Sequence, residues 1–255
     1  MLFTNLVQAN LKTRILGKHI EYYTRLESTN SEAWELINDG CENGTVIVTD
    51  NQYSGKGRGN RNWYAAPNKS LSFSIVLSPN INSKFSNWIP LISCIAIQKA
   101  IATFSTTVEF KYPNDIMFGK KKLGGILCES KVSEKKINQA VIGIGINVNE
   151  EIEDFDIAIK NTATSLHINS KRLYQKERVL AEILNQLEII IDQFPSNIDL
   201  IKSNWEDSCN HMNQKITFHY NNKVIKGIFK SLSNSGNAIL EIKGEEKEYF
   251  TGEII

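Results

Sequence analysis

The spacing of hydrophobic and polar positions changes several times along the chain and predicts a different element at each change. Residues 28–40 open with Ser, Thr and Asn, continue with apolar residues at helical spacing and end on glycine, which are the start and stop signals of a short helix. Residues 45–49 predict a buried strand. Residues 50–70 have no apolar period and are rich in Gly, Asn, Ser and cations, so we expect a loop there and no regular element.

The middle of the chain is dominated by predicted strands. Residues 71–77 alternate as a strand does, and residues 88–104 carry an apolar stripe at helical spacing. Further strands are predicted at residues 108–111, 116–118, 122–132 and 140–148, with a hairpin turn at 119–121. Because strands follow one another without strict alternation with helices, the pattern indicates an α+β domain and not a doubly wound parallel sheet.

The last part of the chain changes character again. Residues 173–194 predict a long amphipathic helix and residues 198–207 a second helix. After these helices, short strands are predicted at residues 215–220, 224–232, 238–242 and 248–250, with turns at 221–222 and 235–237. We therefore expect a larger α+β domain at residues 1–208 and a small all-β, barrel-like domain at residues 209–255.

Composition and charge exclude several classes of function. The 29 Lys and Arg residues nearly balance the 28 Asp and Glu residues, so no field of the whole chain attracts nucleic acid or an anionic membrane. No apolar stretch approaches the roughly 20 residues that span a bilayer, which predicts a soluble, cytoplasmic protein. The 4 cysteines lack CxxC spacing, which argues against a zinc site and against a disulfide framework.

The first segment with chemical character is QYSGKGRGNRNW at residues 52–63, where glycines alternate with cations. Glycines let backbone N–H groups approach an anion closely, and Arg58 and Arg61 can each bind phosphate or carboxylate oxygens with a guanidinium fork. The segment lacks the third glycine of the dinucleotide fingerprint, because position 60 is Asn, and Lys56 is followed by Gly57 and not by the Ser or Thr of a P-loop. The alternative interpretation is a solvated basic loop or a nonspecific nucleic-acid contact.

Two further segments contain glycines where strands are predicted. In KYPND at residues 111–115, Pro113 belongs at an edge or turn and exposes the Asn and Asp that follow, and the paired glycines of KLGGILCE at residues 122–129 allow a ligand to lie against the backbone. A β-bulge with a surface salt bridge is the alternative. In VIGIGINVN at residues 141–149, glycines occupy one face of the strand, which indicates either a bound ligand or close packing of another element there.

Together with Ser28-Thr29-Asn30, these three segments resemble the biotin protein ligases in order, spacing and residue type, from about Tyr22 to the end of the chain. The resemblance implies an α+β, class II synthetase-like biotin/lipoate ligase fold, with a mixed central β-sheet, flanking helices and a small SH3-like C-terminal domain. It implies an ATP-dependent ligase that forms biotinyl-AMP from biotin and ATP and transfers biotin to a lysine of a biotin carboxyl carrier domain.

The resemblance also implies roles for individual residues. Lys122 would contact the biotin carboxylate and the α-phosphate, Asp115 would act in transfer as a base or by orienting the amine, and Arg58 would help to close the loop; these three are the candidate catalytic residues. The candidate biotin-binding residues are Ser28, Thr29, Asn30, Gln52, Gly55, Lys56, Arg58, Lys122, Gly124, Gly125, Gly143 and Gly145. The candidate nucleotide-binding residues are Arg58, Arg61, Trp63, Lys111, Asn114, Lys122 and Asn147. No residue is assigned to a metal.

The expected substrates are ATP with Mg²⁺ and biotin, without a permanent prosthetic group, and the expected partner is a biotin carboxyl carrier protein or domain of a biotin-dependent carboxylase. We expect a monomer or homodimer that binds neither nucleic acid nor membrane. The lead before Ser28 is too short for the winged-helix DNA-binding domain of some family members, about 60 residues, so we expect no repressor function. Lys56 and Asn60 depart from the Arg and Gly usual in the family loop.

Two other functions compete with this interpretation. Lipoate or octanoate ligases share the fold and the acyl-adenylate chemistry, but they carry a different Arg- and Gly-rich signature with a His-Asp pair, and the histidines at 167, 211 and 219 lie outside the three segments. A nonenzymatic nucleic-acid-binding protein would use the Gly/Arg loop, whose aromatic residues are limited to Tyr53, Trp63 and Tyr64. Steep salt dependence of RNA binding would favour this second alternative.

Overall fold

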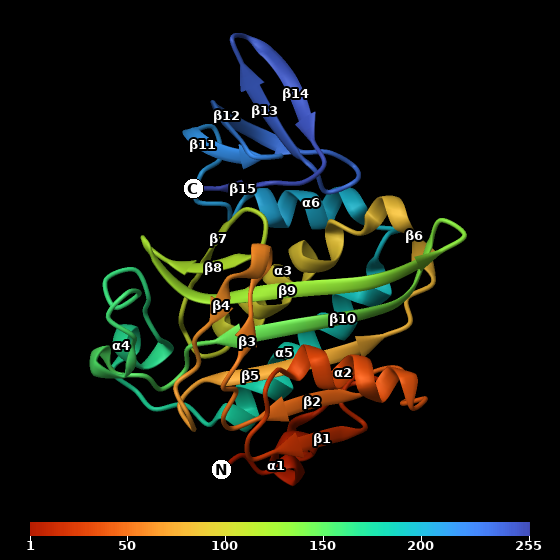
Figure 1. Cartoon of the computed structure of the whole chain (residues 1–255), viewed down its shortest axis with the longest axis vertical. Helices are drawn as coiled ribbons and strands as arrows, with labels where there is room; N and C mark the ends of the chain where they lie inside the picture. Colours follow the sequence, from red (N-terminus) through yellow and green to blue (C-terminus); the bar gives the residue numbers. More distant parts are fainter.

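A mixed sheet forms the centre of the larger part of the molecule (Figure 1) in the computed structural model, which describes residues 1–255 with the exception of the Asn60 side chain. Its strand order is β1-β2-β5-β10-β9-β8-β7, with β6 beside β10. Strands β1 and β2 are parallel and the other neighbours are antiparallel, which confirms the expected mixed sheet. The strands are β1 Ile20–Tyr23, β2 Val46–Thr49, β5 Leu71–Leu77, β6 Ile81–Asn82, β7 Glu109–Lys111, β8 Asp115–Phe118, β9 Lys121–Ser133 and β10 Lys136–Ile146.

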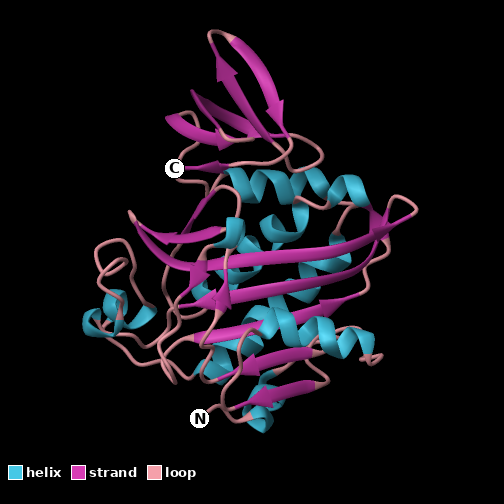
Figure 2. Cartoon of the chain, viewed as in Figure 1, coloured by secondary structure: helices cyan, strands magenta, loops and turns pink.

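Helices cover both faces of this sheet, as the ribbon coloured by secondary structure shows (Figure 2). The alternation of side chains along β2 explains why both faces are apolar: Val46 and Val48 join the large core with α3 and α5, whereas Ile47 points to the opposite face, where it packs against Ala33 and Ile37 of α2. The helices are α1 Thr4–Asn10, α2 Thr29–Asn38, α3 Trp88–Ala102, α4 Leu166–Ser170, α5 Lys176–Gln193 and α6 Ile198–Glu206. Among the residues that the structure describes, no helix is long and apolar enough to cross a membrane.

A second, separate sheet follows α6 and confirms the expected all-β C-terminal part. Its order is β14-β13-β12-β11-β15, and Phe218, Phe229 and Leu240 are fully buried within it. The last strand, β15, was not among the predicted strands, because two residues are too few to show an alternation. The strands are β11 Lys215–Tyr220, β12 Lys223–Leu232, β13 Ala238–Ile242, β14 Glu245–Tyr249 and β15 Glu253–Ile254.

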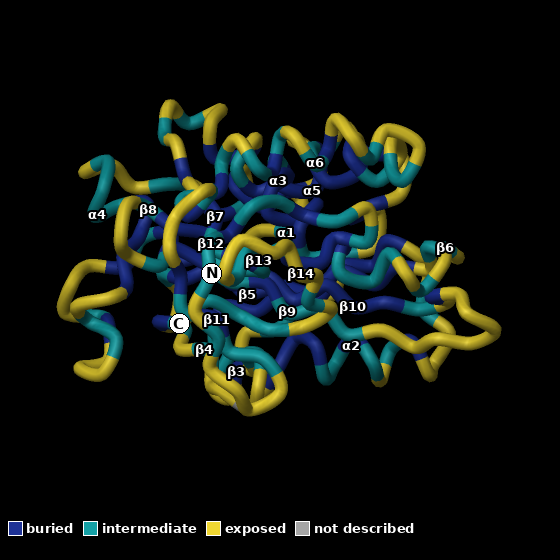
Figure 3. The backbone as a smooth tube through the Cα atoms, turned by 90° about the horizontal axis from the view of Figure 1, so that it is seen from above, coloured by how far each residue is buried: buried dark blue, intermediate teal, exposed yellow. Residues whose placement is uncertain are grey.

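The segment at residues 50–70 corrects the sequence prediction, because it contains a small hairpin where no element was expected. Strand β3 (Gly55–Lys56) pairs with β4 (Asn62–Trp63), and a 3₁₀ turn at Arg58–Asn60 joins them. The backbone N–H of Gly57 donates to the Arg61 carbonyl oxygen at 2.7 Å. Much of the hairpin is exposed, in contrast to the fully buried β5 (Figure 3), so its pairing left no apolar pattern in the sequence.

Other differences concern the ends of elements and short elements. The helix expected from residue 173 begins at Lys176, and the helix expected to reach residue 104 ends at Ala102. Strands β9 and β10 are longer than predicted and meet at Glu134 and Lys135, both of which have positive φ. Helices α1 and α4 and strand β1 were missed because each is shorter than the window over which a period becomes visible.

Candidate active site

The three glycine-containing segments and the start of α2 meet around one cavity on the α2 face of the sheet. They come together because β8, β9 and β10 are neighbours in the sheet, while the β3–β4 hairpin lies across this face (Figure 1). The predicted site residues that line the cavity are Ser28, Thr29, Asn30, Gln52, Lys56, Arg58, Arg61, Trp63, Asn114, Asp115, Lys122, Gly125, Gly143 and Gly145.

A network of hydrogen bonds holds the polar end of the cavity in place. The backbone N–H of Thr29 donates to Gln52 Oε1 at 2.9 Å, and the Thr29 hydroxyl contacts the same oxygen at 3.2 Å. The Ser74 hydroxyl lies 2.7 Å from Thr29 Oγ1 and 2.6 Å from Asn30 Oδ1. The Asn30 amide donates to Glu129 Oε2 at 2.7 Å. These side chains are therefore oriented before a ligand arrives, which is what a selective polar pocket requires.

Ser74 and Glu129 are site residues that the sequence analysis missed. Each lies on the face of the large sheet that carries the cavity glycines, because Ser74 pairs with Gly143 and Glu129 lies four residues along β9 from Gly125. The available signal was a polar residue on the glycine-bearing face of an otherwise apolar stretch of strand. Both form hydrogen bonds with Asn30 and neither lines the cavity, so a search for residues that contact substrate directly could not identify them.

The glycines of β10 are required because side chains pack directly against their backbone. A methyl group on Gly143 would overlap the Asn30 side chain, and a methyl group on Gly145 would overlap the Trp63 indole. A methyl group on Gly125 would lie 3.3 Å from Lys122 Nζ. The glycine face therefore makes room for α2 and β4, whose side chains in turn line the cavity.

Lys122 and Asp115 form an ion pair inside the cavity. Their Nζ and Oδ1 atoms are 2.5 Å apart, and the side chains are 38% and 23% exposed, so both groups remain accessible to a small ligand. The ammonium also lies 5.8 Å from the centre of the Trp63 ring. The Lys122 backbone is held by residues 162–164, because its N–H donates to the Thr162 carbonyl oxygen at 2.7 Å and its own carbonyl oxygen accepts from Thr164 at 2.9 Å. The backbone of Lys122 is therefore fixed, while its long side chain allows the ammonium to move within the cavity.

The two arginines of the β3–β4 hairpin contact the C-terminal sheet. Arg58 donates to the Gly252 carbonyl oxygen from both terminal nitrogens at 3.3 Å, and it contacts Asn114 Oδ1 at 3.5 Å. Arg61 forms an ion pair with the carboxylate of Glu253. The second sheet therefore touches the cavity through the hairpin, a contact that no local sequence pattern indicated.

Some predicted residues lie near the cavity without lining it. Gly55 is buried behind Gln52, and a methyl group on Gly124 would meet the Ile146 side chain, so both belong to the layer behind the wall. Asn147 lines a second, adjacent cavity that shares Asn62, Trp63 and Lys122 with the first. The lining of this second cavity is Asn62, Trp63, Tyr64, Lys122, Asn147, Ile159, Thr162 and Ala163.

Lys111 is not among the residues that line either cavity. It pairs with Asp115 in the register of β7 and β8, and its charge acts on His211, whose pKa is lowered to about 3 by burial and then by Lys111. The Asn60 side chain, a departure from the family loop, lies outside the described residues. Among the described residues, no group of three or more His, Cys, Asp or Glu side chains is placed to hold a metal ion.

Comparisons with known proteins agree on one family. Residues 22–147 match the model of the biotin/lipoate A/B protein ligase family. The chain is 30% identical to the bifunctional ligase/repressor BirA of Bacillus spizizenii over 97% of the chain and 77% of BirA. It is 21% identical to the biotin--[acetyl-CoA-carboxylase] ligase of Mycobacterium tuberculosis over 97% of the chain and 94% of that protein.

Among solved structures, the chain resembles the biotin protein ligase from Aquifex aeolicus in complex with biotin and ATP. The TM-score is 0.79 at 26% identity, over 93% of this chain and 98% of the other. A structure of the biotin protein ligase from Leishmania major in complex with biotinyl-5-AMP has a TM-score of 0.64 at 18% identity and shares the fold.

Proposed function

We infer the activity of this chain from its family, because the chain belongs to the biotin protein ligases within the biotin/lipoate A/B protein ligase family. It is an ATP-dependent ligase that forms biotinyl-AMP from biotin and ATP and transfers the biotin to a protein. The observation that carries this conclusion is the meeting of all four motif segments around one cavity. The M. tuberculosis relative and the A. aeolicus structure are biotin ligases, which favours biotin over lipoate as the substrate.

The two adjacent cavities suit the two substrates. The first has the oriented Thr29, Gln52 and Asn30 groups that a cyclic urea ring needs as hydrogen-bond partners, so we assign it to biotin. The second has apolar and aromatic walls and suits the nucleoside. Trp63 and Lys122 line both, and the buried Trp63 Nε1 has no hydrogen-bond partner among the described residues, so it is free to donate to a ligand. The biotin carboxylate and the α-phosphate would therefore meet at Lys122.

The first half-reaction follows from this placement. A carboxylate oxygen of biotin attacks the α-phosphorus of ATP, a P–O bond forms, and the bond to pyrophosphate breaks. Both reacting groups are anions, so the main barrier is their repulsion and the charge that builds in the transition state. Lys122 can leave Asp115 and place its ammonium between them, and the guanidinium groups of Arg58 and Arg61, which line the first cavity, would bind phosphate oxygens.

The second half-reaction needs a base where the first needs a cation. The amine of the acceptor lysine attacks the carbonyl carbon of biotinyl-AMP, an amide bond forms, and AMP leaves. The attacking amine must lose a proton, and Asp115 is a carboxylate in the cavity that can accept it or orient the amine. The departure of Lys122 towards the substrate would free Asp115 for this role.

We treat Mg²⁺ as part of the nucleotide substrate. Mg²⁺ prefers oxygen ligands and is commonly held by one or two protein groups together with substrate phosphates. Asn114 and Asn147 line the two cavities and offer amide oxygens of this kind. Lys111, which lies outside both cavity walls, would act on the phosphates only through its longer-range charge.

The acceptor is a biotin carboxyl carrier protein or domain in this proposal. The support is the M. tuberculosis relative, which is a biotin--[acetyl-CoA-carboxylase] ligase. A cytoplasmic location and a monomeric or homodimeric state stay predictions, as does the expectation that neither nucleic acid nor a membrane is a partner.

We further propose that the chain divides into two domains near residue 208. The last helix, α6, packs against α3 and ends at Glu206, and the strands of the second sheet begin at Lys215. The C-terminal domain would assist catalysis by holding the arginine hairpin through Gly252 and Glu253.

The function is tested by incubating the purified protein with ATP and Mg²⁺ and either biotin or lipoate, and by detecting the acyl-adenylate by mass spectrometry. Biotinyl-AMP is the expected product. Lipoyl-AMP alone would retain the reaction and overturn the substrate. The absence of both adenylates, together with RNA binding that weakens steeply with salt, would establish the nonenzymatic alternative.

Replacing Asp115 with asparagine is expected to impair transfer more than adenylation. Transfer requires removal of a proton from the attacking amine, whereas the biotin carboxylate is already ionised when it attacks ATP. We expect transfer from preformed biotinyl-AMP to a carrier domain to slow by about 100-fold or more. Adenylate formation should fall by much less, and single-turnover assays separate the two steps.

A matched control is Glu241→Gln, which breaks the Lys230–Glu241 ion pair of the C-terminal sheet outside both cavities, at a carboxylate that is 33% exposed against 23% for Asp115. This control should leave both steps unchanged. Equal losses in adenylation and transfer for Asp115→Asn would show that this carboxylate has no separate role in transfer.

Replacing Gly143 with alanine is expected to weaken biotin binding. The added methyl group would overlap the Asn30 side chain and displace it from its contacts with Ser74 and Glu129. We expect the KM for biotin to rise about tenfold or more, because a small misplacement of positioning groups has large effects. Gly40→Ala at the end of α2 is the control, since it strains a φ of 85° with no neighbouring atom within 4 Å. A variant at Gly143 with unchanged KM would contradict this account of the glycine face.

A further inference from the structure

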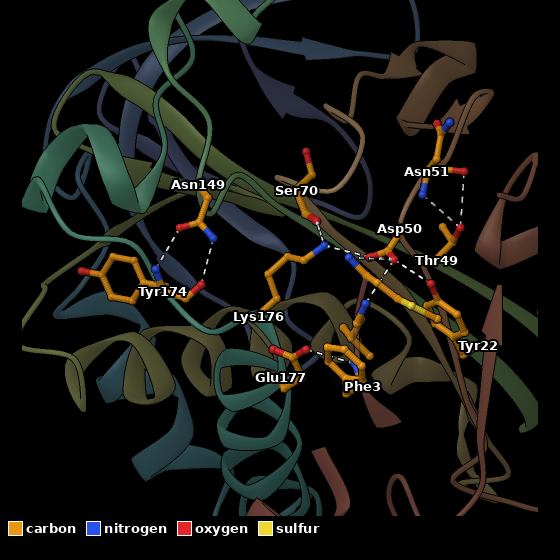
Figure 4. A network of polar contacts seen from close by, with 12 residues as sticks. Phe3, Tyr22, Thr49, Asp50, Asn51, Ser70, Asn149, Tyr174, Lys176 and Glu177 are labelled. Carbon is orange, nitrogen blue, oxygen red and sulfur yellow. Dashed lines mark hydrogen bonds and ion pairs between the residues drawn. The ribbon is translucent and has the colours of Figure 1, made fainter. Parts of the chain in front are cut away.

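We propose that Lys176 is a positioning residue that fastens both ends of the substrate loop, residues 51–69, to helix α5. This inference rests on the proposed function, because that loop carries Gln52, Arg58 and Arg61. The close-up of the polar network (Figure 4) shows the Lys176 side chain reaching from α5 towards Asp50 and Ser70, which flank the loop on either side.

The contacts of Lys176 join the two stems of the loop through one charge. Its Nζ lies 3.0 Å from Asp50 Oδ1 and donates to the Ser70 carbonyl oxygen at 3.3 Å. Asp50 follows the last residue of β2, and Ser70 precedes the first residue of β5. A third tie runs between the stems themselves, where the Asn68 N–H donates to the Asp50 carbonyl oxygen at 2.8 Å. The Lys176 ammonium therefore connects the N-terminal and C-terminal ends of the loop.

The Lys176–Asp50 ion pair is buried, so both charges must be compensated by hydrogen bonds. The Lys176 and Asp50 side chains are 8% and 5% exposed, and a buried charge is tolerated only when it is paired and hydrogen-bonded. The second carboxylate oxygen of Asp50 accepts from the Tyr22 hydroxyl at 2.6 Å and from the Leu2 N–H at 3.1 Å, and the Met1 amino group lies 3.5 Å from it. Burial raises the pKa of Asp50, but the hydrogen bonds from Tyr22 and Lys176 outweigh this and hold that pKa below its usual range.

The tie acts on the active site through the short distance along the chain from Asp50 to Gln52. Gln52 Oε1 accepts from the Thr29 backbone and forms part of the polar end of the cavity. At the other stem, the Ser70 hydroxyl donates to the buried carboxyl of Glu150, whose pKa burial raises to about 7. With both stems held, the exposed hairpin between them can move while Gln52 stays in register with α2.

The alternative is an ion pair that stabilises α5 and has no role in the loop. Helix α5 offers a control for this, because Glu188 is buried to a similar degree, 8% against 7% for Lys176 as whole residues. Its carboxylate accepts from the backbone N–H groups of Arg14, Ile15 and Leu16 at 2.6, 2.8 and 2.9 Å. Glu188 therefore ties α5 to residues 14–16, and none of these hydrogen bonds involves the substrate loop.

The test compares Lys176→Met/Asp50→Asn with Glu188→Gln. The double variant removes the tie without leaving an unpaired buried carboxylate, and Lys176→Met alone and Lys176→Arg complete the series. We expect the double variant to raise the KM for biotin about tenfold and to shorten the lifetime of bound biotinyl-AMP by a similar factor, with kcat for adenylation at saturating substrate little changed. Lys176→Arg should keep KM and the adenylate lifetime close to the wild-type values, because arginine retains the positive charge. Glu188→Gln should lower Tm without changing KM.

A second readout does not depend on activity. Trypsin cleavage after Lys56, Arg58 or Arg61 in the ligand-free protein should be faster in the double variant than in Glu188→Gln at an equal loss of Tm. Unchanged KM and unchanged cleavage in the double variant would overturn the proposal, as would equal changes in Glu188→Gln. If the wild-type protein forms no biotinyl-AMP, the proposed function fails, and the cleavage comparison still decides whether Lys176 holds the loop.

Discussion

Lys122→Ala is expected to abolish biotinyl-AMP formation while the protein stays folded. Among the described residues that line both cavities, Lys122 is the only cation. Its ammonium can move from the Asp115 carboxylate to the two substrate anions. Alanine removes this charge from the point where the biotin carboxylate meets the α-phosphate. We expect the rate of adenylate formation to fall by about 1,000-fold, the upper end of the effects that follow loss of one group stabilising the charge that develops in the transition state.

The measurement is a single-turnover assay of biotinyl-AMP with saturating biotin and ATP. Stability should change little, because the Lys122 side chain is 38% exposed and contributes little to the core. Lys121→Ala is the matched control, an exposed lysine one residue earlier on the same strand, and it should form the adenylate at the wild-type rate. Adenylate formation at the normal rate in Lys122→Ala would remove Lys122 from the mechanism.

Arg58→Gly is expected to let biotinyl-AMP escape from the enzyme before transfer. Arg58 is the residue that joins the hairpin to Asn114 on one side and, on the other, to the carbonyl oxygen of Gly252, which directly precedes β15 of the C-terminal sheet. Glycine removes these contacts and adds backbone freedom at the tip of the hairpin, so the loop cannot stay closed over the adenylate. We expect the lifetime of the bound adenylate to fall by about 100-fold.

The lifetime can be measured by trapping with unlabelled substrates after a pulse of labelled biotin. Arg58→Lys should give an intermediate result, because lysine keeps the charge but loses the fork. Arg25→Gly tests whether a nearby glycine alone is sufficient, since the Arg25 guanidinium stacks 4.6 Å from the Tyr53 ring and is not part of the cavity lining. An unchanged lifetime in Arg58→Gly would mean that other contacts retain the adenylate.

The two expectations depend on different parts of the structure. Lys122 acts at the junction of the cavities, so its loss affects bond formation. Arg58 lies in the hairpin and contacts Asn114 and Gly252 in addition to its proposed role at the phosphate, so its loss affects retention of the adenylate more than its formation. If Lys122→Ala slows adenylate formation and Arg58→Gly mainly shortens the adenylate lifetime, the hairpin serves to retain the adenylate and Lys122 serves to form it.

Much of the fold and most of the site could be predicted from local sequence. The strand at residues 71–77 and the glycine face of residues 141–149 show a two-residue period in the sequence. This period can be recognised without the tertiary structure, because side-chain direction in a strand alternates with each residue. The Gly/Arg loop could be identified by residue type, since anions require cations and close backbone approach, whereas Lys122 was assigned through the resemblance to the biotin protein ligases. The β3–β4 pairing itself was missed because exposed strands of two residues carry no apolar pattern.

The sequence by itself determined the chemistry that this chain carries: the apolar faces of a mixed sheet, a cation-rich glycine loop, and Lys122 and Asp115 beside paired glycines. Only the tertiary structure decided which groups hold these in place. Ser74 and Glu129 orient Asn30, Gly252 and Glu253 hold the arginine hairpin, and Lys176 joins the stems of the loop across more than 100 residues of sequence. The physical reason is that periodicity and residue type are local properties, whereas a hydrogen bond between buried groups exists only once distant strands and helices have packed together.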